Sequence, residues 1–553
     1  AGLNVAMLEY RGNQRRNRIA FVEEDPPQEA VEELKKLWGY ELYSLESSHL
    51  AEPGELATTE AVIFRQAAEK PRRVLDQLKR YASTLLLHDC RVFIQPALAP
   101  EGLDAAAFRR MVVDALNELR LPPSGLSKDD AMAFGAWFEG RDSAQLTPFV
   151  HLVGRPGVWS DVAALLRDYP AGDPPRNDLR IDVVDAEGKP SQLTPEQEIL
   201  IRRSFSNCTS IHLVALKNGL SRVLTFRTYV HLLDLEGGAG GNWPFIYFVK
   251  IGERAKISKE YRAYRDIALE HIPYHLGPRL RLNRCTLGHT QGIIVSDYVS
   301  GAETLKDCAR NGRAVPVIAN LFNSTLWAWR NISSDPEAFP LQEYLCEKMS
   351  LPIPPHRKPL IDAFGASRSL EDLKTVVRKV DGGPVHVGAI HGDLHATNVL
   401  VRGTDAIVID FEKVEPRAPI LWDMASLEGG LFVDGFIGDR RSGQELLKSV
   451  ACLYEPSAFN GDVLSYHPRD GSAWFFDCVR QIRMQARPIT NASRQYPLVL
   501  AAVLVHKACN KDDFREEKTE GLSREDVRAL AYLLSERILV EISAADSARG
   551  TAE

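Results

Sequence analysis

The sequence predicts an α+β fold, with a β-rich part followed by a mainly helical part, both preceded by an α/β domain. Short apolar runs alternate with helical patterns in the first 125 residues. Strand-like runs then gather between residues 211 and 298, and mostly helical sequence follows. Alternating strands and helices are typical of a parallel sheet with helices on its faces, whereas separate runs of strands and helices favour α+β.

Length and charge narrow the class of protein. A chain of 553 residues predicts about two to four domains, each with its own core. Apolar residues make up 44% and charged residues 25%, which is typical of a soluble globular protein. The net charge is −7 without a basic domain, so we expect no nucleic-acid partner.

The cysteines and the apolar runs indicate the cellular compartment of the protein. The eight cysteines are scattered, without metal-ligand spacing, which argues against zinc and fits a reducing compartment. The chain starts without the apolar core of a signal peptide. Its longest apolar stretch, Tyr496–Val505, is too short for a bilayer. We therefore expect a cytoplasmic protein that does not contact a membrane.

The elements divide the chain into four parts. In the first part, the apolar runs Ile19–Val22, Ala61–Phe64 and Val92–Ile94 predict buried strands, and Glu29–Trp38 and Pro71–Leu87 predict helices. Residues rich in Pro, Gly and Asp follow, and are either a linker or a small accessory domain. The predicted parts are an α/β domain (1–125), this linker or accessory domain (126–194), a β-rich lobe (195–300) and a helical lobe (301–553).

The β-rich lobe is predicted to open with a helix. Thr194 precedes Pro195 and stands three residues before Gln197, which is the pattern of a capping box with Pro at the first helical position. Apolar runs then predict the strands, and an amphipathic pattern covers Ser258–Glu270. The predicted strands are Ile211–Leu216, Val223–Val230, Phe245–Ile251 and Gly292–Tyr298, with a short strand at Ile181–Asp185 ahead of them.

The strongest chemical signal is the string HGDLHATNVL from His391, followed by AIVIDFE from Ala406. Asp393 lies in a loop, where a carboxylate can orient a substrate hydroxyl or accept its proton. Asn398 offers an amide oxygen to a metal. A predicted hairpin after Asn398 returns Asp410 towards the loop, where both oxygens can share Mg²⁺ with nucleotide phosphates.

This pattern resembles the aminoglycoside phosphotransferase and choline kinase-like family, whose members are relatives of protein kinases. The family's catalytic loop reads H-G-D-x-H-x-x-N, and I-D-F/W-E supplies its metal aspartate. The matching residues are His391, Asp393, His395, Asn398 and Asp410. The resemblance implies a bilobal protein-kinase-like fold, with ATP and Mg²⁺ as cofactors and Asp393 as the catalytic residue.

The loop has a predicted brace. The segment Trp422-Asp423-Met424-Ala425 resembles the family's W-D-x-A segment, in which the Asp supports the catalytic loop by hydrogen bonds. His391 and His395 are expected to support the loop from within it. The alternative for Asp423 is an ordinary acidic residue at a helix N-terminus.

The resemblance requires a nucleotide-binding half upstream. Lys250 ends an apolar run and Glu260 follows on a helix, so Lys250 is expected to hold the α- and β-phosphates and Glu260 to hold Lys250. A strand-end lysine and a solvated glutamate are the alternatives. Gly219 and Ser221 lie in a predicted turn between two strands and are expected to cover the phosphates. The alternative for this turn is a plain β-hairpin without a ligand.

A further strand is expected to receive adenine. The run Ile293–Val295 leads into Asp297, Tyr298 and Val299, which resemble the hinge that contacts adenine through backbone groups. A buried strand without a ligand is the alternative.

The first part loosely resembles a response-regulator receiver domain, a flavodoxin-like sheet. Glu23-Glu24-Asp25 stands at the end of the first strand, as the receiver's acidic residues do. Arg65 and Gln66 stand where a phosphorylated Asp belongs, and Gln95-Pro96 replaces a Lys-Pro pair. We expect a degenerate receiver that docks a protein partner, or else an unrelated α/β domain.

The predicted function is transfer of the ATP γ-phosphoryl group to a hydroxyl of an unidentified small molecule or protein, in a regulatory setting. Two alternatives stay open: a pseudokinase-type nucleotide-binding or scaffold module, and a protein nucleotidyltransferase on the same fold. Charges of both signs from Lys507 to Lys518 predict a solvated face, so the sequence does not identify the acceptor.

Overall fold

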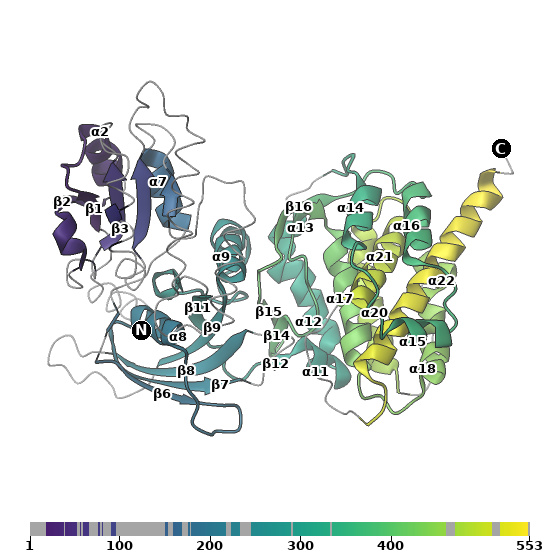
Figure 1. Cartoon of the computed structure of the whole chain (residues 1–553). Helices are drawn as coiled ribbons and strands as arrows, with labels where there is room; N and C mark the ends of the chain where they lie inside the picture. The colour runs from purple at the N-terminus through teal and green to yellow at the C-terminus, as the bar shows by residue number, and fades with distance from the viewer. Residues whose placement is uncertain are drawn as a thin grey trace. The chain divides into compact units, whose positions relative to one another are not determined.

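A computed structural model gives the chain two compact units, Ala1–Tyr261 with Leu280–Tyr298, and Arg262–Arg279 with Val299–Glu553 (Figure 1). Each unit has its own sheets and helices. The structure describes residues 18–37, 39–51, 56, 59–65, 76–77, 80, 90–95, 150–152, 159–168 and 175–550, the last range without 177, 217–222, 233–244, 289–290, 332–334, 461–470 and 511–519.

The first part contains a parallel sheet with the order β2-β1-β3-β4-β5. Flavodoxin-like sheets have this strand order. The predicted helix at 71–87 lies almost wholly outside the described residues, so the flavodoxin-like and receiver-like assignments stay predictions. The strands are β1 (Arg18–Val22), β2 (Glu41–Leu45), β3 (Thr59–Arg65), β4 (Arg91–Gln95) and β5 (Val150–Leu152).

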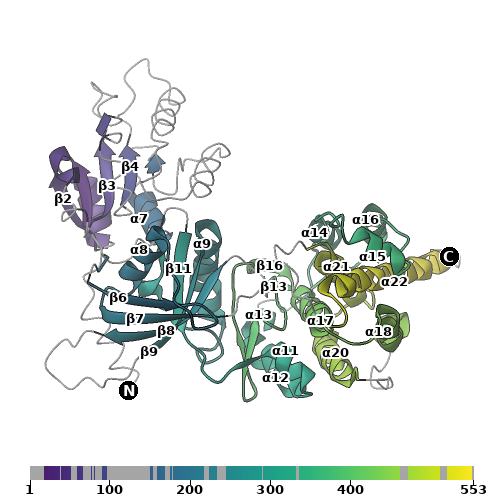
Figure 2. The same ribbon diagram turned by 60° about the horizontal axis from the view of Figure 1, so that its bottom comes forward.

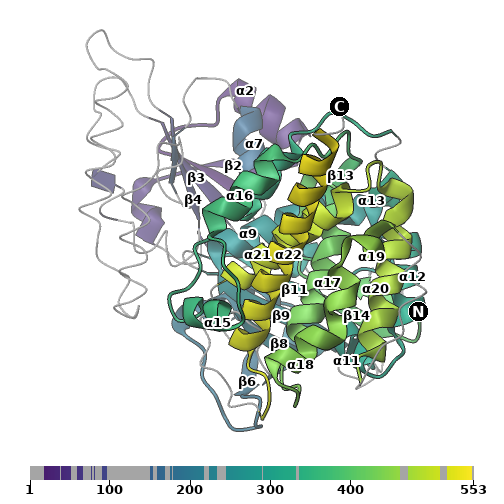
Figure 3. The same ribbon diagram turned by 90° about the vertical axis from the view of Figure 1, so that its right-hand side faces the viewer.

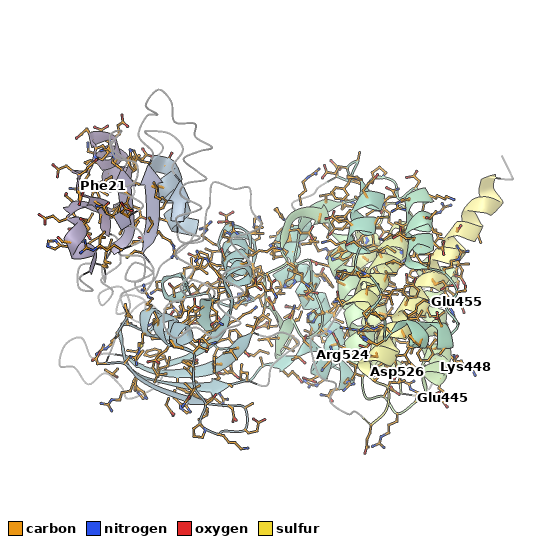
Figure 4. All side chains as sticks on the ribbon, viewed as in Figure 1. Phe21, Glu445, Lys448, Glu455, Arg524 and Asp526 are labelled. Carbon is orange, nitrogen blue, oxygen red and sulfur yellow. The ribbon has the colours of Figure 1, made fainter. Side chains whose placement is uncertain are left out.

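The boundary expected at residue 125 does not end this part. β5 pairs with β4, and helix α7 (Trp159–Asp168) packs on the sheet. The Trp159 ring lies 5.7 Å from that of Phe21, which Figure 4 labels within this unit. The pattern of apolar residues on α7 explains the packing, because Trp159, Val162 and Leu166 recur at helical spacing and are buried. The domain therefore continues at least to Asp168.

The acidic end of β1 is paired with a cation. Arg65, the last residue of β3, forms an ion pair of 2.9 Å with Glu24. The Ser47 hydroxyl donates to Glu23, which has a positive φ of 60°. Arg65, which stands where a receiver domain would carry its phosphorylated Asp, therefore neutralises an acidic residue at the end of β1.

The second sheet of this unit has the order β10-β11-β9-β8-β7-β6 (Figure 2). All its pairs are antiparallel except β6 with β7. The four strands predicted in the β-rich lobe are present, and the short strand predicted at 181–185 is its edge strand β6. Its strands are β6 (Arg180–Val184), β7 (Cys208–Ala215), β8 (Leu224–Leu232), β9 (Phe245–Glu253), β10 (Thr286–Leu287) and β11 (Gln291–Asp297).

Residues 126–194 therefore supply elements to both neighbouring sheets, because β5 joins the first sheet and β6 the second. The helix after them, α8 (Pro195–Ser204), has the predicted capping box. Thr194 accepts the Gln197 backbone N–H, and the Gln197 side chain accepts the Thr194 backbone N–H. Leu200 and Ile201 of α8 are buried in the core of this sheet.

The second unit is mainly helical and carries two small antiparallel sheets. Helices α17, α21 and α22 pack together at its centre (Figure 3). The sheet elements are β12 (Glu303–Thr304), β13 (Val387–Ile390), β14 (Val399–Arg402), β15 (Asp405–Val408) and β16 (Glu415–Pro419). Its larger helices are α14 (Leu341–Lys348), α16 (Leu370–Lys379), α17 (Leu421–Gly435), α18 (Gly443–Val450), α20 (Ala473–Ala486), α21 (Gln495–Cys509) and α22 (Arg524–Gly550).

The remaining helices are shorter. In the part of the chain that the structure covers, none of the helices combines the length and the apolar character that a membrane span needs. The first unit also contains α2 (Gln28–Ala30) and most of α9 (Arg254–Ala263), and the second contains α10 (Leu269–His271), α11 (Leu305–Arg310), α12 (Ala314–Asn320), α13 (Trp327–Asn331), α15 (Lys358–Ala363) and α19 (Pro456–Asn460).

Replacing Trp159 tests whether α7 belongs to the first sheet. Trp159→Ala removes a buried ring that contacts Phe21, so we expect a loss of about 3 kcal/mol in stability of this sheet. Hydrogen-exchange mass spectrometry should show faster exchange in β1 and β3. Ser160→Ala, on the exposed side of the same helix, serves as the control. Unchanged protection of β1 and β3 in Trp159→Ala would restore the boundary at residue 125.

Candidate active site

The catalytic-loop motif lies between two strands of the helical unit. Residues from His391 to Asn398 connect β13 to β14, and β14 pairs with β15 through the predicted hairpin. Arg402 pairs with Asp405, so Gly403 and Thr404 form the turn. The hairpin returns the chain to the loop, since the Ile409 N–H donates to the Asn398 carbonyl at 2.9 Å. Asp410 is the next residue after Ile409, so the hairpin brings it close to Asn398.

Glycine is required at position 392. Gly392 has a φ of +77°, and a Cβ at this position would lie 2.1 Å from the Lys413 carbonyl oxygen. A side chain would therefore force apart the loop and the segment after Asp410. The close approach of these two segments brings Lys413 to Asp393.

Asp423 holds the loop from the first turn of α17. Its carboxylate accepts the backbone N–H of His391 at 2.7 Å and that of Gly392 at 3.0 Å. The neighbouring Trp422 donates its indole N–H to the Gly392 carbonyl at 3.2 Å. Burial raises the pKa of Asp423 to about 6, although His391 and these backbone donors favour the ionised form. The hydrogen bonds expected of Asp423 are thus present.

His391 supports the loop from within. Its Nε2 lies 2.9 Å from the Ile409 carbonyl, which can only accept, so Nε2 carries the proton. Nδ1 then accepts the Asp393 backbone N–H at 3.4 Å. His395 bonds to the Thr397 hydroxyl through Nδ1 at 2.7 Å. Burial, with Lys507 nearby, lowers the pKa of His395.

Asn398 and Asp410 form a fitting pair for a hard cation. The Asn398 amide N–H donates to the Asp393 carbonyl at 3.1 Å, which orients its oxygen as the remaining ligand atom. Asp410 has a φ of 67°, a strained conformation for a residue with a Cβ, of a kind that clusters at functional sites. The described residues contain no group of three His, Cys, Asp or Glu that could hold a metal alone. Mg²⁺, which keeps water and phosphate ligands, needs only one or two protein oxygens of this kind.

Two lysines contact the Asp393 carboxylate. Lys413 Nζ lies 2.8 Å from Oδ2, and Lys507 Nζ lies 3.3 Å from Oδ1. Burial alone would raise the pKa of Asp393, but Lys507, His395 and Lys413 outweigh it and hold the pKa well below its usual range. Asp393 is therefore ionised throughout the neutral range. Burial would lower the pKa of Lys413, but Asp393, together with Glu412 and Asp410, outweighs it and raises that pKa.

Lys507 corrects the prediction of a solvated face in this region. The side chain of Lys507 is only 10% exposed and lies on α21, against Asp393. A signal was present in the sequence: Lys507 follows Val503 and Leu504 at helical spacing, and both are buried. The charged residues from 511 to 518 lie outside the described part of the chain.

The predicted lysine–glutamate pair is present in the other unit. Lys250 on β9 lies 2.7 Å from Glu260 on α9, and both side chains are buried. The spacing of ten residues fits a strand followed directly by a helix. Lys250 and the loop from His391 to Asn398 thus belong to different units. The position of each is fixed by contacts within its own unit. Gly219 and Ser221 lie outside the described residues.

The predicted adenine-binding segment follows β11. The Asp297 carboxylate forms a two-point ion pair with Arg281, at 2.7 and 3.1 Å. The Tyr298 N–H donates to the Ile246 carbonyl at 3.4 Å. The two units divide between Tyr298 and Val299, where a hinge was predicted. The Asp297 side chain is thus engaged within its own unit, and contact of adenine with the backbone groups of this segment stays a prediction.

Part of the helical unit matches the model of a known family. A family model described as ternary complex associated domain 9 matches residues 361–510, which include the catalytic loop and α21. Among curated proteins, no sequence matches the chain.

Several solved structures are similar to the chain. They include a thermostable mutant of aminoglycoside phosphotransferase APH(4)-Ia, in ternary complex with AMP-PNP and hygromycin B (13% identity; 63% of this chain and 99% of that chain covered; TM-score 0.34). They also include the amicoumacin kinase hAmiN in complex with AMP-PNP, Ca²⁺ and Ami (12%; 60% and 88%; 0.31). A third is choline kinase LicA from Streptococcus pneumoniae (14%; 59% and 94%; 0.27). Aminoglycoside phosphotransferases and choline kinase are the proteins that the loop motif resembles.

Removing Lys507 tests the electrostatic environment of Asp393. In Lys507→Met, the Asp393 carboxyl loses one ammonium neighbour, so we expect it to titrate about 1 pH unit higher. Carboxyl ¹³C NMR of the full chain measures this directly. Lys448→Met, which removes an equal charge from the exposed face of α18 (Figure 4), should leave the titration of Asp393 unchanged. An unshifted Asp393 in Lys507→Met would contradict the described contact.

Proposed function

We propose that the chain is a phosphotransferase that uses ATP and Mg²⁺ to transfer the γ-phosphoryl group to a hydroxyl acceptor, in a regulatory setting. One observation carries the proposal: a braced loop presents the Asp393 carboxylate and, five residues later, the Asn398 amide beside Asp410. A chance polar loop has no need of a strained aspartate, an obligatory glycine and a buried bracing carboxylate together.

The low pKa of Asp393 indicates its task. A strongly acidic carboxylate is a poor base, and general-base catalysis favours a pKa near the working pH. Phosphoryl transfer passes through a loose transition state in which positioning matters more than early proton removal. Asp393 therefore orients the acceptor hydroxyl and accepts its proton late. The contacts with Lys507 and Lys413 hold the pKa of this carboxyl low and keep it ionised.

Asn398 and Asp410 are the residues that would hold the magnesium ions. Bound there, Mg²⁺ would neutralise charge on the nucleotide phosphates. In the first unit, Lys250 would contact the α- and β-phosphates, and the ion pair with Glu260 fixes the position of its ammonium group.

A binding function is the second candidate. Both oxygens of Asp393 already contact lysines, and the matched family is described as associated with a ternary complex. These two observations favour a pseudokinase-type module that binds nucleotide and recruits a partner. Transfer of a nucleotidyl group to a protein is the third.

Product analysis separates the three functions. The full chain is incubated with ATP and Mg²⁺, and the products are resolved by chromatography and mass spectrometry. ADP release supports the phosphotransferase, and a nucleotidyl mass added to protein supports the third function. Tight nucleotide binding without turnover supports the binding module.

Asp393→Asn is expected to lower ATP turnover about 100-fold, the usual worth of a positioned proton acceptor. Nucleotide affinity should stay near that of the wild type, because Asp393 serves the acceptor. Steady-state ADP release and calorimetric nucleotide binding measure the two quantities. Asp405→Asn, which removes a carboxylate on the β14–β15 hairpin, is the matched control. Wild-type turnover in Asp393→Asn would remove this residue from the mechanism.

Asp410→Ala is expected to abolish turnover that depends on magnesium. The variant loses a charged oxygen ligand, and it also relieves the strained conformation only in part because alanine keeps a Cβ. Turnover measured across a magnesium titration checks the prediction. Activity with an unchanged magnesium dependence would refute the assignment of Asp410.

A further inference from the structure

Buried arginines from two different elements meet at the connection between β10 and β11. Arg91, the first residue of β4, donates from Nη2 to the Leu287 carbonyl at 3.0 Å. Arg254, the first residue of α9, donates from Nη1 to the Gly288 carbonyl. Both arginines are buried, and a buried guanidinium is costly unless it is hydrogen-bonded. The first sheet and α9 are therefore attached to the same short segment of the second sheet.

Helix α8 holds the same β10–β11 connection. The Gly288 N–H donates to the Gln291 carbonyl at 2.8 Å, and the Gln291 N–H donates to the Glu196 carboxylate of α8 at 3.1 Å. A Cβ at position 288 would lie 2.7 Å from Glu196 Oε1, so a side chain there would displace this carboxylate. The connection thus has partners from three separate elements, namely β4, α8 and α9.

Helix α9 also packs on this connection and carries Glu260. Ile257 and Tyr261 of α9 belong to one buried apolar cluster with Leu287, the residue whose carbonyl accepts from the first sheet (Figure 2). Glu260 precedes Tyr261, and its carboxylate lies 2.7 Å from the Lys250 ammonium. Because buried side chains are closely packed, a displacement of the connection displaces α9 as well. The carboxylate that fixes Lys250 then moves with the helix.

Arg91 links two sheets that are far apart in the sequence. The Leu287 carbonyl lies 196 residues after Arg91. Parallel strands begin at the same edge of a sheet, so the start of β4 lies at the edge opposite to the one where Arg65 ends β3. The core of the first sheet is an apolar cluster. The guanidinium therefore reaches away from this core to a carbonyl of the second sheet.

We propose that the α/β domain regulates the nucleotide-binding half through Arg91, which is a positioning residue for Glu260 and Lys250. With the first sheet in place, the guanidinium holds the β10–β11 connection, α9 packs on it, and the Lys250–Glu260 pair forms. Movement of the domain withdraws the guanidinium and loosens α9. Nucleotide affinity then falls, because the ammonium group loses its fixed position. The inference rests on the proposed function for the contact between Lys250 and the phosphates.

Removal of the guanidinium tests this coupling. In Arg91→Met, which keeps an apolar stem, we expect faster hydrogen exchange in α9 and a Kd for AMP-PNP with Mg²⁺ that rises about tenfold, within the usual range for coupled sites. Hydrogen-exchange mass spectrometry and calorimetry of the full chain measure the two effects. Arg65→Met removes an arginine from the opposite edge of the same sheet and should change neither. Wild-type exchange of α9, or wild-type affinity, in Arg91→Met would overturn the inference.

A double-mutant cycle separates this route from a general loss of stability. Glu260→Gln removes the charged partner of Lys250. If Arg91 acts through Glu260, Arg91→Met should weaken AMP-PNP binding by less than about twofold in the Glu260→Gln background. Full additivity of the two losses would overturn the inference. Loss of protection in β1 and β3 of Arg91→Met leaves the test in force, since an α9 that stays protected after release of the domain would also overturn it.

The exchange measurement distinguishes failure of this inference from failure of the proposed function. Absence of ADP release while AMP-PNP still binds counts against the phosphotransferase, and the affinity test then remains in force. If the wild type binds no nucleotide, the proposed function fails. Exchange of α9 in Arg91→Met, with Arg65→Met as the control, then still decides whether the first sheet positions this helix.

Discussion

The catalytic loop depends on one buried carboxylate. Asp423 accepts the consecutive N–H groups of His391 and Gly392, and Trp422 beside it donates to the Gly392 carbonyl. The His391 N–H is buried, and leaving it without a partner would cost about 1 to 3 kcal/mol, whereas the Gly392 groups are partly buried. Helix α17 is itself fixed by Glu428, which forms a two-point ion pair with Arg483 and accepts the Tyr496 hydroxyl. The packing of the helical core therefore fixes the position of the loop.

That position determines the electrostatics of Asp393. Because Gly392 allows the loop to approach Lys413, and α21 places Lys507 on the opposite oxygen, the carboxylate stays ionised despite burial. A carboxylate in this state is suited to orienting a hydroxyl. The same two contacts also suit a nucleotide-binding module whose aspartate is permanently occupied. Turnover, rather than the presence of Asp393, therefore distinguishes the two functions.

In the first domain, the parallel sheet does not depend on which polar residues stand at the ends of its strands. Its core is formed by apolar strand residues and by α7, and depends little on the polar residues at the strand ends. Arg65 can therefore stand where a receiver domain would carry its phosphorylated Asp, and pair with Glu24, without loss of the sheet. Such an arrangement agrees with a docking or regulatory role that does not use phosphorylation, and that role stays a prediction.

The sequence by itself determined the features that depend on near neighbours. The capping box at Thr194 and Gln197, the hairpin that returns Asp410, and the Lys250–Glu260 pair all follow from spacings within about a dozen residues, over which local geometry is regular. Only the tertiary structure decided that β5 completes the first sheet and that Lys507 contacts Asp393, 114 residues away. Contacts over such separations depend on how helices and strands pack, and a local pattern does not specify that packing.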